Sequence, residues 1–463
     1  ADHVGLAVPK RADHGNSLSI GGQREHIAIV LEQNHRFARY VARSFEKFRL
    51  VQRCFLPRLV RIAVGIFEQS EAIFHFEHTA RGGVDLIHAY PSRGDRTGEV
   101  FEEDRALQVH IDAGVERLAG AVMGGERIAV FADYDVDGAT SAALMIRLFR
   151  MLGHEAGYYI PDRLLEGYGP SGEALVKLGE EGSSLVVTVD CGAMAHEALG
   201  MAHDAGIDVI VVDHHKCSPD LPKTVALVNP NRLDEEDEAA SHGHLAAVGV
   251  AFLLAIALVR TLRNRSYFEN RKEPDLLALL DVVALGTVAD VAALHGLNRA
   301  FVAQGLKVMA KRDNIGMAAL IDASRLKRAP ACSDLGFALG PRINAGGRVG
   351  ESTLGVRLLT TRDPDEAREI AAQLSALNDE RRAIEAAVQE AAEEQLAAQH
   401  NRAVHLVAGE GWHPGVIGIV AGRIKEKTGK PSLVIALDGQ TGKGSGRSIT
   451  GGDLGAAIIR ARS

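Results

Sequence analysis

Three apolar segments of the chain are rich in valine, and each ends in an aspartate. They read AVFAD, VVTVD and VIVVD and end at Asp133, Asp190 and Asp213. Continuous runs of β-branched residues are typical of strands that are covered on both faces, as in parallel sheets. Segments with helical spacing lie between the three runs. We therefore predict an α/β protein whose parallel sheet is covered by helices on both faces.

A stretch without internal glycine or proline, residues 364–399, divides this pattern from a second one. It is rich in alanine, glutamate, leucine and arginine, which predicts one helix longer than about 50 Å. A coiled coil is the alternative, but the apolar positions do not hold a heptad repeat. Strand, helix and strand patterns follow it. We predict an N-terminal segment without a clear pattern (1–105), a larger α/β domain (106–362), a connecting helix (363–400) and a smaller α/β domain (401–463).

Composition indicates the cellular compartment of the protein more clearly than its activity. The net charge of the 463 residues is −8, so a nucleic-acid partner would need a local basic groove. No run of 18 apolar residues is present, and the N-terminus lacks a signal-peptide pattern. The four cysteines (Cys54, Cys191, Cys217 and Cys332) form no CxxC pair, as in proteins of a reducing compartment. We expect a cytoplasmic monomer that does not enter a membrane.

Carboxylates and histidines gather where the predicted strands end. They are Asp133, Asp135, Asp137, Asp190, Asp213, His214, His215 and, in a later apolar stretch, Asp290. In an extended chain the first three would point the same way. A single aspartate after a strand commonly caps the next helix, which we expect to begin near Thr140 or Ser141. So many carboxylates at one sheet edge repel one another unless cations neutralise them. Oxygen and imidazole ligands suit Mg²⁺ or Mn²⁺.

Two such ions about 4 Å apart can stabilise both the attacking and the leaving oxygen in a phosphoryl transfer. The segment TGKGSGRS at 441–448 lacks the spacing of a P-loop, and no GxGxxG motif follows the first strand. Nucleotide hydrolysis by a P-loop and hydride transfer to a dinucleotide are therefore disfavoured.

Four motifs in order, DYDVDG (133–138), VDCG (189–192), DHH (213–215) and GTVAD (286–290), resemble the metal-site motifs of the DHH phosphoesterase superfamily. Further segments resemble the RecJ family of single-strand-specific 5′→3′ exonucleases. They are PDRLLEGYG (161–169), GPRINAGGRVGE (340–351), WHPGVIGIVAGR (412–423) and GSGRS (444–448). The resemblance covers residues 106–463 and implies a parallel-sheet DHH domain joined by a long helix to a smaller DHHA1-type domain.

The resemblance implies a role for individual residues. The metal ligands for two Mn²⁺ or Mg²⁺ ions would be Asp133, Asp135, Asp190, His214 and Asp290, with Asp190 as the bridge. His215 would contact the scissile phosphate, and Asp213 would support the histidines. Asp137 would either join the cluster or form the Asp-Gly turn. Ser445 and Arg447 resemble a pocket for a terminal 5′-phosphate, Arg163 and Tyr168 resemble contacts to phosphate and base, and Arg342, Asn344 and Arg348 resemble further backbone contacts.

The implied function is metal-dependent hydrolysis of single-stranded DNA from its 5′ end, in recombination and repair, with single-strand-binding protein and a RecQ-type helicase as partners. The usual start of the family and its C-terminal GGGH and OB-type segments have no counterpart in the sequence, which suggests a truncated chain. Alternatives are therefore a phosphodiesterase for short oligonucleotides or cyclic dinucleotides, a non-catalytic DNA-binding scaffold, and an inactive fragment.

Overall fold

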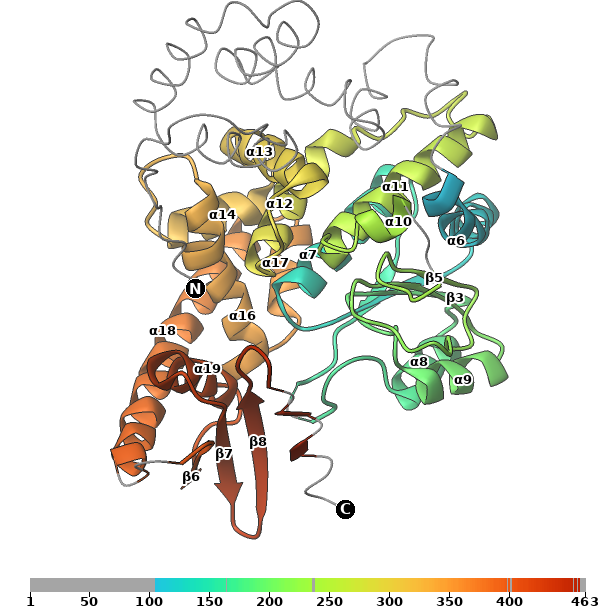
Figure 1. Ribbon diagram of the computed structural model, residues 1–463. Helices are drawn as coiled ribbons and strands as arrows, with labels where there is room; N and C mark the ends of the chain where they lie inside the picture. The colour runs from blue at the N-terminus through green and yellow to red at the C-terminus, as the bar shows by residue number, and fades with distance from the viewer. Residues whose placement is uncertain are drawn as a thin grey trace, which may run out of the picture. The chain divides into compact units, whose positions relative to one another are not determined.

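The computed structural model describes residues 105–458, except residues 164, 235–237, 398, 400, 401, 453 and 456 (Figure 1). The N-terminal segment expected at 1–105 therefore lies outside the described residues, apart from Arg105.

The larger sheet has five strands, and every pair in it is parallel. Its order is β2-β1-β3-β4-β5. The strands are β1 (Ile128–Ala132), β2 (Gly157–Tyr159), β3 (Leu185–Val189), β4 (Asp208–Val212) and β5 (Ala226–Val228). All residues of β1 and β3 are buried, as expected for strands that are covered on both faces. The predicted α/β class is confirmed, although β2 was not foreseen.

Helices cover both faces of this sheet (Figure 1). On one face, α8 (Gly172–Glu180) and α9 (His196–Asp204) enclose a core with side chains of β1, β3 and β4, among them Phe131, Val186 and Val211. The opposite face is covered by α6 (Arg105–Gly124), α7 (Val136–Met151) and α11 (Ala247–Asn264). By length and composition α11 could span a membrane, but 78% of it is buried inside the protein, as in a core helix.

Further helices complete the larger part of the fold. They are α10 (Glu238–Ser241), η1 (Leu276–Leu279), α12 (Leu280–Ala289), α13 (Gly296–Lys311), α14 (Ile315–Ala323), α15 (Cys332–Asp334), η2 (Leu335–Leu339), α16 (Gly340–Val349) and α17 (Leu354–Thr360). Of these, α12 packs against α7 and α13 and ends just before Asp290. This packing brings the C-terminal end of α12 to the start of α7.

The predicted long helix is α18 (Pro364–Ala397), which has 34 residues. It leads into a three-stranded sheet with β6 (His405–Glu410), β7 (Ser432–Asp438) and β8 (Thr441–Arg447), and α19 (Ile417–Thr428) packs on this sheet. Val388 and Ala392 of α18 enter the core of this smaller part. Glu385 of α18 is buried and forms ion pairs with Arg381 and with Arg423 of α19. The strand β8, antiparallel to β7, was not foreseen. The division into domains at the stated boundaries stays a prediction.

Candidate metal centre

The first aspartates follow β1 but do not continue it as a strand. Asp135 is the N-cap of α7, and its side chain accepts hydrogen bonds from the backbone N–H groups of Asp137 and Gly138. The helix thus begins at Val136, and the expected start near Thr140 or Ser141 is wrong. The reason is that Asp135 supplies the capping oxygen one turn earlier. Gly138 packs directly on the backbone of Asp133, because a Cβ at Gly138 would lie 2.3 Å from the Asp133 carbonyl oxygen.

Asp137 lies in the first turn of the helix α7, not in an extended chain as the sequence suggested. It is buried, and its two carboxylate oxygens accept hydrogen bonds from the backbone of Ala247 (2.7 Å) and Val248 (3.0 Å) at the start of α11. Its Oδ2 also lies 3.9 Å from Nε2 of His214. Asp137 therefore joins two helices through charge-assisted hydrogen bonds, a role that neither sequence interpretation included.

Asp190 follows β3 in a left-handed backbone conformation, with φ of 60°. This conformation is uncommon outside glycine and concentrates at functional positions. The carboxylate is buried and belongs to two groups of side chains whose ligand atoms lie within 4.8 Å of one another. One group contains Asp133, Asp135 and Asp190, and the other contains Asp190, His214 and His215. Asp190 is thus the residue common to both groups.

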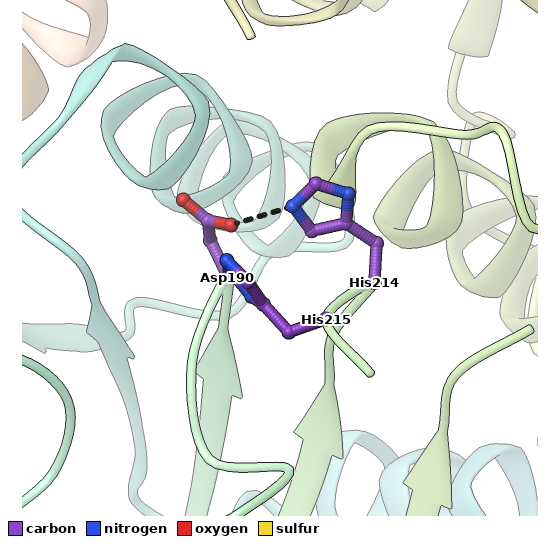
Figure 2. Close-up of side chains that lie close together, drawn as sticks. All are labelled: Asp190, His214 and His215. Carbon is purple, nitrogen blue, oxygen red and sulfur yellow. Dashed lines mark ion pairs between the residues drawn. The ribbon is translucent and has the colours of Figure 1, made fainter. Parts of the chain in front are cut away.

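The DHH residues follow β4 and have different partners. Asp213 is buried and accepts hydrogen bonds from the backbone of Ala193, His214 and His215 and from Nδ1 of His215 at 2.7 Å. His214 instead contacts the carbonyl oxygen of Leu245 through Nδ1 at 3.1 Å. Figure 2 shows its Nε2 facing Asp190, with 3.3 Å between Nε2 and Oδ1. Asp213 therefore supports the side chain of His215, but only the backbone of His214.

A third group completes the centre with a residue from α12. Asp137, His214 and Asp290 have ligand atoms within 4.8 Å of one another. Because Asp290 is the C-cap of α12, the packing of α12 on α7 places it beside the residues that follow the strands. The structure thus brings together all eight predicted acidic and histidine residues in three overlapping groups and the Asp213–His215 pair.

The crowded carboxylates strongly perturb one another. Burial and the charge of Asp135 raise the pKa of Asp133 to about 7. Burial and neighbouring aspartates raise the pKa values of Asp137 and Asp190 well above the ordinary value, and burial raises that of Asp290. Burial is the largest influence on Asp213 and opposes its ionisation, but the hydrogen bonds from His215 and from the backbone of Ala193, together with the charge of His215, jointly outweigh it and lower the Asp213 pKa. The hydrogen bond between Nδ1 of His215 and the Asp213 carboxylate also raises the pKa of His215.

The predicted strand contacts Arg163 and Tyr168 lie near this centre. The Arg163 guanidinium lies 5.2 Å from the centroid of the Tyr134 ring, a favourable cation–π distance. Tyr168 is 56% exposed, yet its hydroxyl donates a hydrogen bond to the backbone carbonyl of Asp190 at 3.1 Å and lies 3.3 Å from Nδ1 of His215. Tyr168 therefore presents its ring to solvent at the edge of the centre.

The predicted backbone contacts Arg342, Asn344 and Arg348 lie on α16 and are each partly buried. Arg342 donates hydrogen bonds to Ser375 of α18 and to the carbonyl of Ala338. Arg348 donates to the carbonyl of Gly415 at 3.1 Å, and burial together with the charge of Arg163 lowers its pKa to about 10. Both arginines thus form hydrogen bonds that join segments within the protein.

Ser445 and Arg447 lie together on β8 above the start of α19. Nη1 of Arg447 donates to the Ser445 hydroxyl at 3.1 Å. A Cβ at Gly418, the second residue of α19, would lie 3.0 Å from Ser445 Oγ and 3.1 Å from Arg447 Nη2. The first N–H groups of a helix lack intrahelical partners and favour anions. A hydroxyl, a guanidinium and a helix N-terminus therefore meet at one place.

Comparison with known proteins agrees with this geometry. Residues 127–287 match the model of the DHH family, N-terminal domain. The single-stranded-DNA-specific exonuclease RecJ of Dickeya dadantii is 42% identical over 392 residues, which cover 81% of this chain and 68% of that protein. The RecJ of Escherichia coli is 41% identical over 393 residues, which cover 81% of this chain and 67% of that protein. The chain belongs to the RecJ family of single-stranded-DNA-specific exonucleases.

Solved structures of the RecJ family contain Mn²⁺ or Mg²⁺. An exonuclease RecJ bound to manganese has 34% sequence identity and a TM-score of 0.65, over 76% of this chain and 85% of that one. RecJ from Thermus thermophilus with Mg²⁺ has 30% identity and a TM-score of 0.56, over 82% of this chain and 51% of that one. The residues of this RecJ-family chain fit such ions, because they offer carboxylate oxygens and imidazole nitrogens. In addition, Oδ1 of Asp133 is buried without a hydrogen-bond partner among the described residues.

Sequence analysis of this RecJ-family chain missed the residues that hold the histidine backbones. Nδ2 of Asn229 donates to the carbonyl of His215 at 2.8 Å, and Nδ2 of Asn231 donates to the carbonyl of His214 at 2.6 Å. Both belong to the segment NPN (229–231), which directly follows β5. The rule that polar residues gather at the carboxyl ends of parallel strands would have found them.

Proposed function

We propose that this chain is a divalent-metal-dependent exonuclease that hydrolyses single-stranded DNA from the 5′ end and releases mononucleotides. The observation that carries the proposal is the position of Asp190, which is shared by two groups of possible metal ligands. A shared carboxylate suits a pair of ions, which is the arrangement used for in-line displacement at phosphorus. The names of the curated relatives support the same substrate.

In this proposal Asp133, Asp135, Asp190, His214 and Asp290 hold two Mn²⁺ or Mg²⁺ ions. The ions, when bound, would supply the Lewis acidity that phosphodiester hydrolysis requires. The surrounding residues orient these ligands. Asp135 is fixed by its capping hydrogen bonds at the start of α7, and His214 is oriented by the carbonyl of Leu245. Asp137 holds α11 in place and contributes its negative charge to the cluster.

His215 is proposed to contact the scissile phosphate. Its side chain is 48% exposed, whereas the neighbouring Asp213 is buried. The hydrogen bond to Asp213 favours the protonated imidazole and raises the His215 pKa. A protonated imidazole that is oriented by a buried carboxylate is well suited to an anionic group in solvent. Asp213 thus acts through His215.

The polarity of cleavage is proposed to come from Ser445 and Arg447. Their position above the start of α19 provides donors and positive charge for a terminal 5′-phosphate. Arg163, Tyr168, Arg342, Asn344 and Arg348 are proposed to contact the strand. Because the chain is acidic overall, such a local group of arginines is needed for binding DNA.

The cellular setting is proposed from membership of the family. We propose a role in recombination and repair, with single-strand-binding protein and a RecQ-type helicase as partners, for a monomer in the cytoplasm. The tripartite pattern of larger domain (106–362), connecting helix (363–400) and smaller domain (401–463) is proposed as the unit that binds the strand.

A direct test uses 5′-phosphorylated single-stranded DNA that is labelled at its 3′ end, with Mn²⁺ or with EDTA. A 5′→3′ exonuclease gives a ladder of progressively shorter labelled strands, whereas cleavage from the 3′ end releases the label at once. The ladder is expected with Mn²⁺ only, and not with an Asp190→Asn variant or a blunt duplex.

Two results would overturn the proposal. Cleavage restricted to di- and trinucleotides would assign the chain to phosphodiesterases of short oligonucleotides. If folded protein with bound Mn²⁺ cleaves none of these substrates, the metal centre is not that of a nuclease.

A further inference from the structure

A short segment that leads into the first turn of α11 contacts two members of the metal centre through its backbone. This segment, residues 243–248, is called the strap here. The Leu245 carbonyl oxygen lies 3.1 Å from Nδ1 of His214, and the backbone N–H groups of Ala247 and Val248 donate to Asp137. The position of the strap therefore affects both a histidine and a carboxylate of the centre.

The contact with Leu245 determines which nitrogen of His214 carries the proton. A carbonyl oxygen can only accept a hydrogen bond, so Nδ1 of His214 must be the protonated nitrogen. In the neutral imidazole the lone pair is then on Nε2, which lies 3.3 Å from Oδ1 of Asp190. A histidine binds a metal through the nitrogen that lacks the proton. The strap thus selects the tautomer that leaves Nε2 available in the centre.

Asn231 fixes one side of the strap. Its Nδ2 donates to the carbonyl of His214 at 2.6 Å and to the carbonyl of Gly243 at 3.0 Å. The strap passes very close to this amide, because a Cβ at Gly243 would lie 2.4 Å from Oδ1 of Asn231. One carboxamide therefore joins the backbone of the histidine to the backbone of the strap.

Asn298 of α13 fixes the other side. It is fully buried, with 0% exposure. Its Nδ2 donates to the carbonyl of His244 in the strap at 2.7 Å and to the carbonyl of Ala293 at 3.1 Å, in the loop that follows Asp290. Its Oδ1 is buried without a hydrogen-bond partner among the described residues. Burying an unpartnered oxygen is unfavourable, so packing alone does not explain an asparagine here. The two amide hydrogens do.

We infer that Asn231 and Asn298 are positioning residues that hold the strap from both sides and thereby fix His214 with its proton on Nδ1 and its Nε2 toward the metal ions. The inference rests on the proposed function for the presence of those ions. The amide nitrogens of both asparagines donate to backbone carbonyl groups. Both hold the strap and with it the Leu245 carbonyl. In addition, Asn231 holds the backbone of His214, and Asn298 joins the strap to the loop of Asp290.

The experiment replaces each amide by a carboxylate of the same size, in Asn231→Asp and Asn298→Asp. Each change removes both donors without opening a cavity. Mn²⁺ affinity is measured by electron paramagnetic resonance of free Mn²⁺. The tautomer of His214 is measured in metal-free protein by NMR of the ring nitrogens, with His214→Gln for assignment.

We expect Mn²⁺ binding to weaken by about 10- to 100-fold, the usual range for residues that orient a metal ligand. We also expect the His214 signal to become a mixture of tautomers. At saturating Mn²⁺, kcat is expected to recover.

Asn378→Asp is the matched control. Asn378 is also buried, at 4% exposure, but it lies on α18 and accepts a hydrogen bond from Arg381. The Mn²⁺ affinity of the Asn378→Asp variant and the tautomer of its His214 should equal those of the unchanged protein. Asn298→Ser, which keeps one donor, is expected to have an intermediate effect and serves if Asn298→Asp does not fold.

The outcomes separate the two proposals. If the unchanged protein binds Mn²⁺ and the variants bind it equally well with an unaltered tautomer, the inference is overturned. If the unchanged protein binds no Mn²⁺, the proposed function fails. The tautomer in metal-free protein still decides the inference about the strap in that case.

Discussion

Nε2 of His214 and Oδ1 of Asp190 lie 3.3 Å apart, although the two residues follow different strands of the sheet. The parallel register of β3 and β4 produces this approach, because it ends both strands at the same edge. Asp190 also groups with Asp133 and Asp135, which follow β1. Three neighbouring strands thus supply one centre, and Asp190 lies at its middle.

The central position of Asp190 predicts a specific loss of bound metal. Asp190→Asn should remove the carboxylate common to two groups and abolish binding of both ions, whereas Asp290→Asn should leave one ion bound. Exonuclease activity of Asp190→Asn should fall by more than about 100-fold, since a direct ligand matters more than the residues that orient it. Titration with Mn²⁺, followed by electron paramagnetic resonance, gives the stoichiometry. Equal stoichiometry in the two variants would contradict a bridging role.

The raised pKa of Asp133 predicts how the metal-free protein responds to pH. The folded pKa of about 7 lies above the ordinary value of 3.8, so the folded state binds more protons than the unfolded state between these values. Stability of the metal-free protein should therefore fall as pH rises from about 4 to about 7. Asp137 and Asp190 act in the same direction. Thermal unfolding in EDTA across this range is the measurement.

One variant and one added ion test whether the buried carboxylates cause this pH dependence of stability. Asp133→Asn should weaken the pH dependence and raise the unfolding temperature at pH 8 in EDTA, because it removes a buried charge. Mn²⁺ should raise the unfolding temperature of the unchanged protein most at pH 8, where the ligands are deprotonated. A pH dependence that is unaffected by Asp133→Asn would show that other groups cause it.

Gly138 should tolerate no side chain. A Cβ there would lie 2.3 Å from the carbonyl oxygen of Asp133. That oxygen belongs to the backbone and the Cβ is fixed to the backbone, so neither atom can move independently. Gly138→Ala should reduce the free energy of unfolding by about 1–3 kcal/mol and weaken Mn²⁺ binding, since relief of the clash moves Asp133. Urea unfolding and Mn²⁺ titration measure the two effects.

Gly120→Ala is the control for Gly138. Gly120 lies within α6, and a Cβ there would meet nothing within 4 Å. Replacing an exposed helical glycine by alanine should stabilise the protein by about 0.5–1 kcal/mol. Mn²⁺ binding should not change. If both substitutions destabilise equally, contact with Asp133 is not the reason.

The pair Ser445 and Arg447 predicts a preference for phosphorylated ends. In Arg447→Ala the ratio of kcat/KM for 5′-phosphorylated over 5′-hydroxyl DNA should fall by about 10- to 100-fold, the range for one charged hydrogen bond. Cleavage of 5′-hydroxyl DNA should change little. Lys443→Ala is the control for a general loss of positive charge. Lys443 lies on the same strand, two residues before Ser445. If kcat/KM falls equally for 5′-phosphorylated and 5′-hydroxyl DNA, Arg447 binds the strand rather than its terminus.

The sequence predicted the parts of the centre that depend on local pattern. Runs such as VVTVD determine a buried strand and the residue at its end, and the parallel arrangement then determines the edge at which Asp133, Asp190 and His214 meet. The helical pattern of 364–399 similarly predicted α18, which needs no knowledge of its partners.

Contacts made by backbone atoms of distant segments could not be predicted in this way. Asp137 bonds to Ala247 and Val248, and His214 bonds to the carbonyl of Leu245. Any residue type can supply a backbone N–H or carbonyl, so no sequence pattern reveals such a partner. The start of α7 was misplaced for a related reason. Asp135 is counted among metal-site motifs, and its second role as a helix cap is not visible until the geometry is known.

The wide separation of the centre's residues along the chain has a consequence for folding. Asp133 follows the first strand of the sheet, whereas Asp290 follows α12, after the whole sheet and α11 have been made. No short stretch of nascent chain carries a complete set of ligands, so a metal ion cannot nucleate folding as it does in a zinc finger. Uptake of Mn²⁺ would instead mark the last stage of folding. In a refolding experiment, the moment at which the ion is captured would report that sheet and helices have come together.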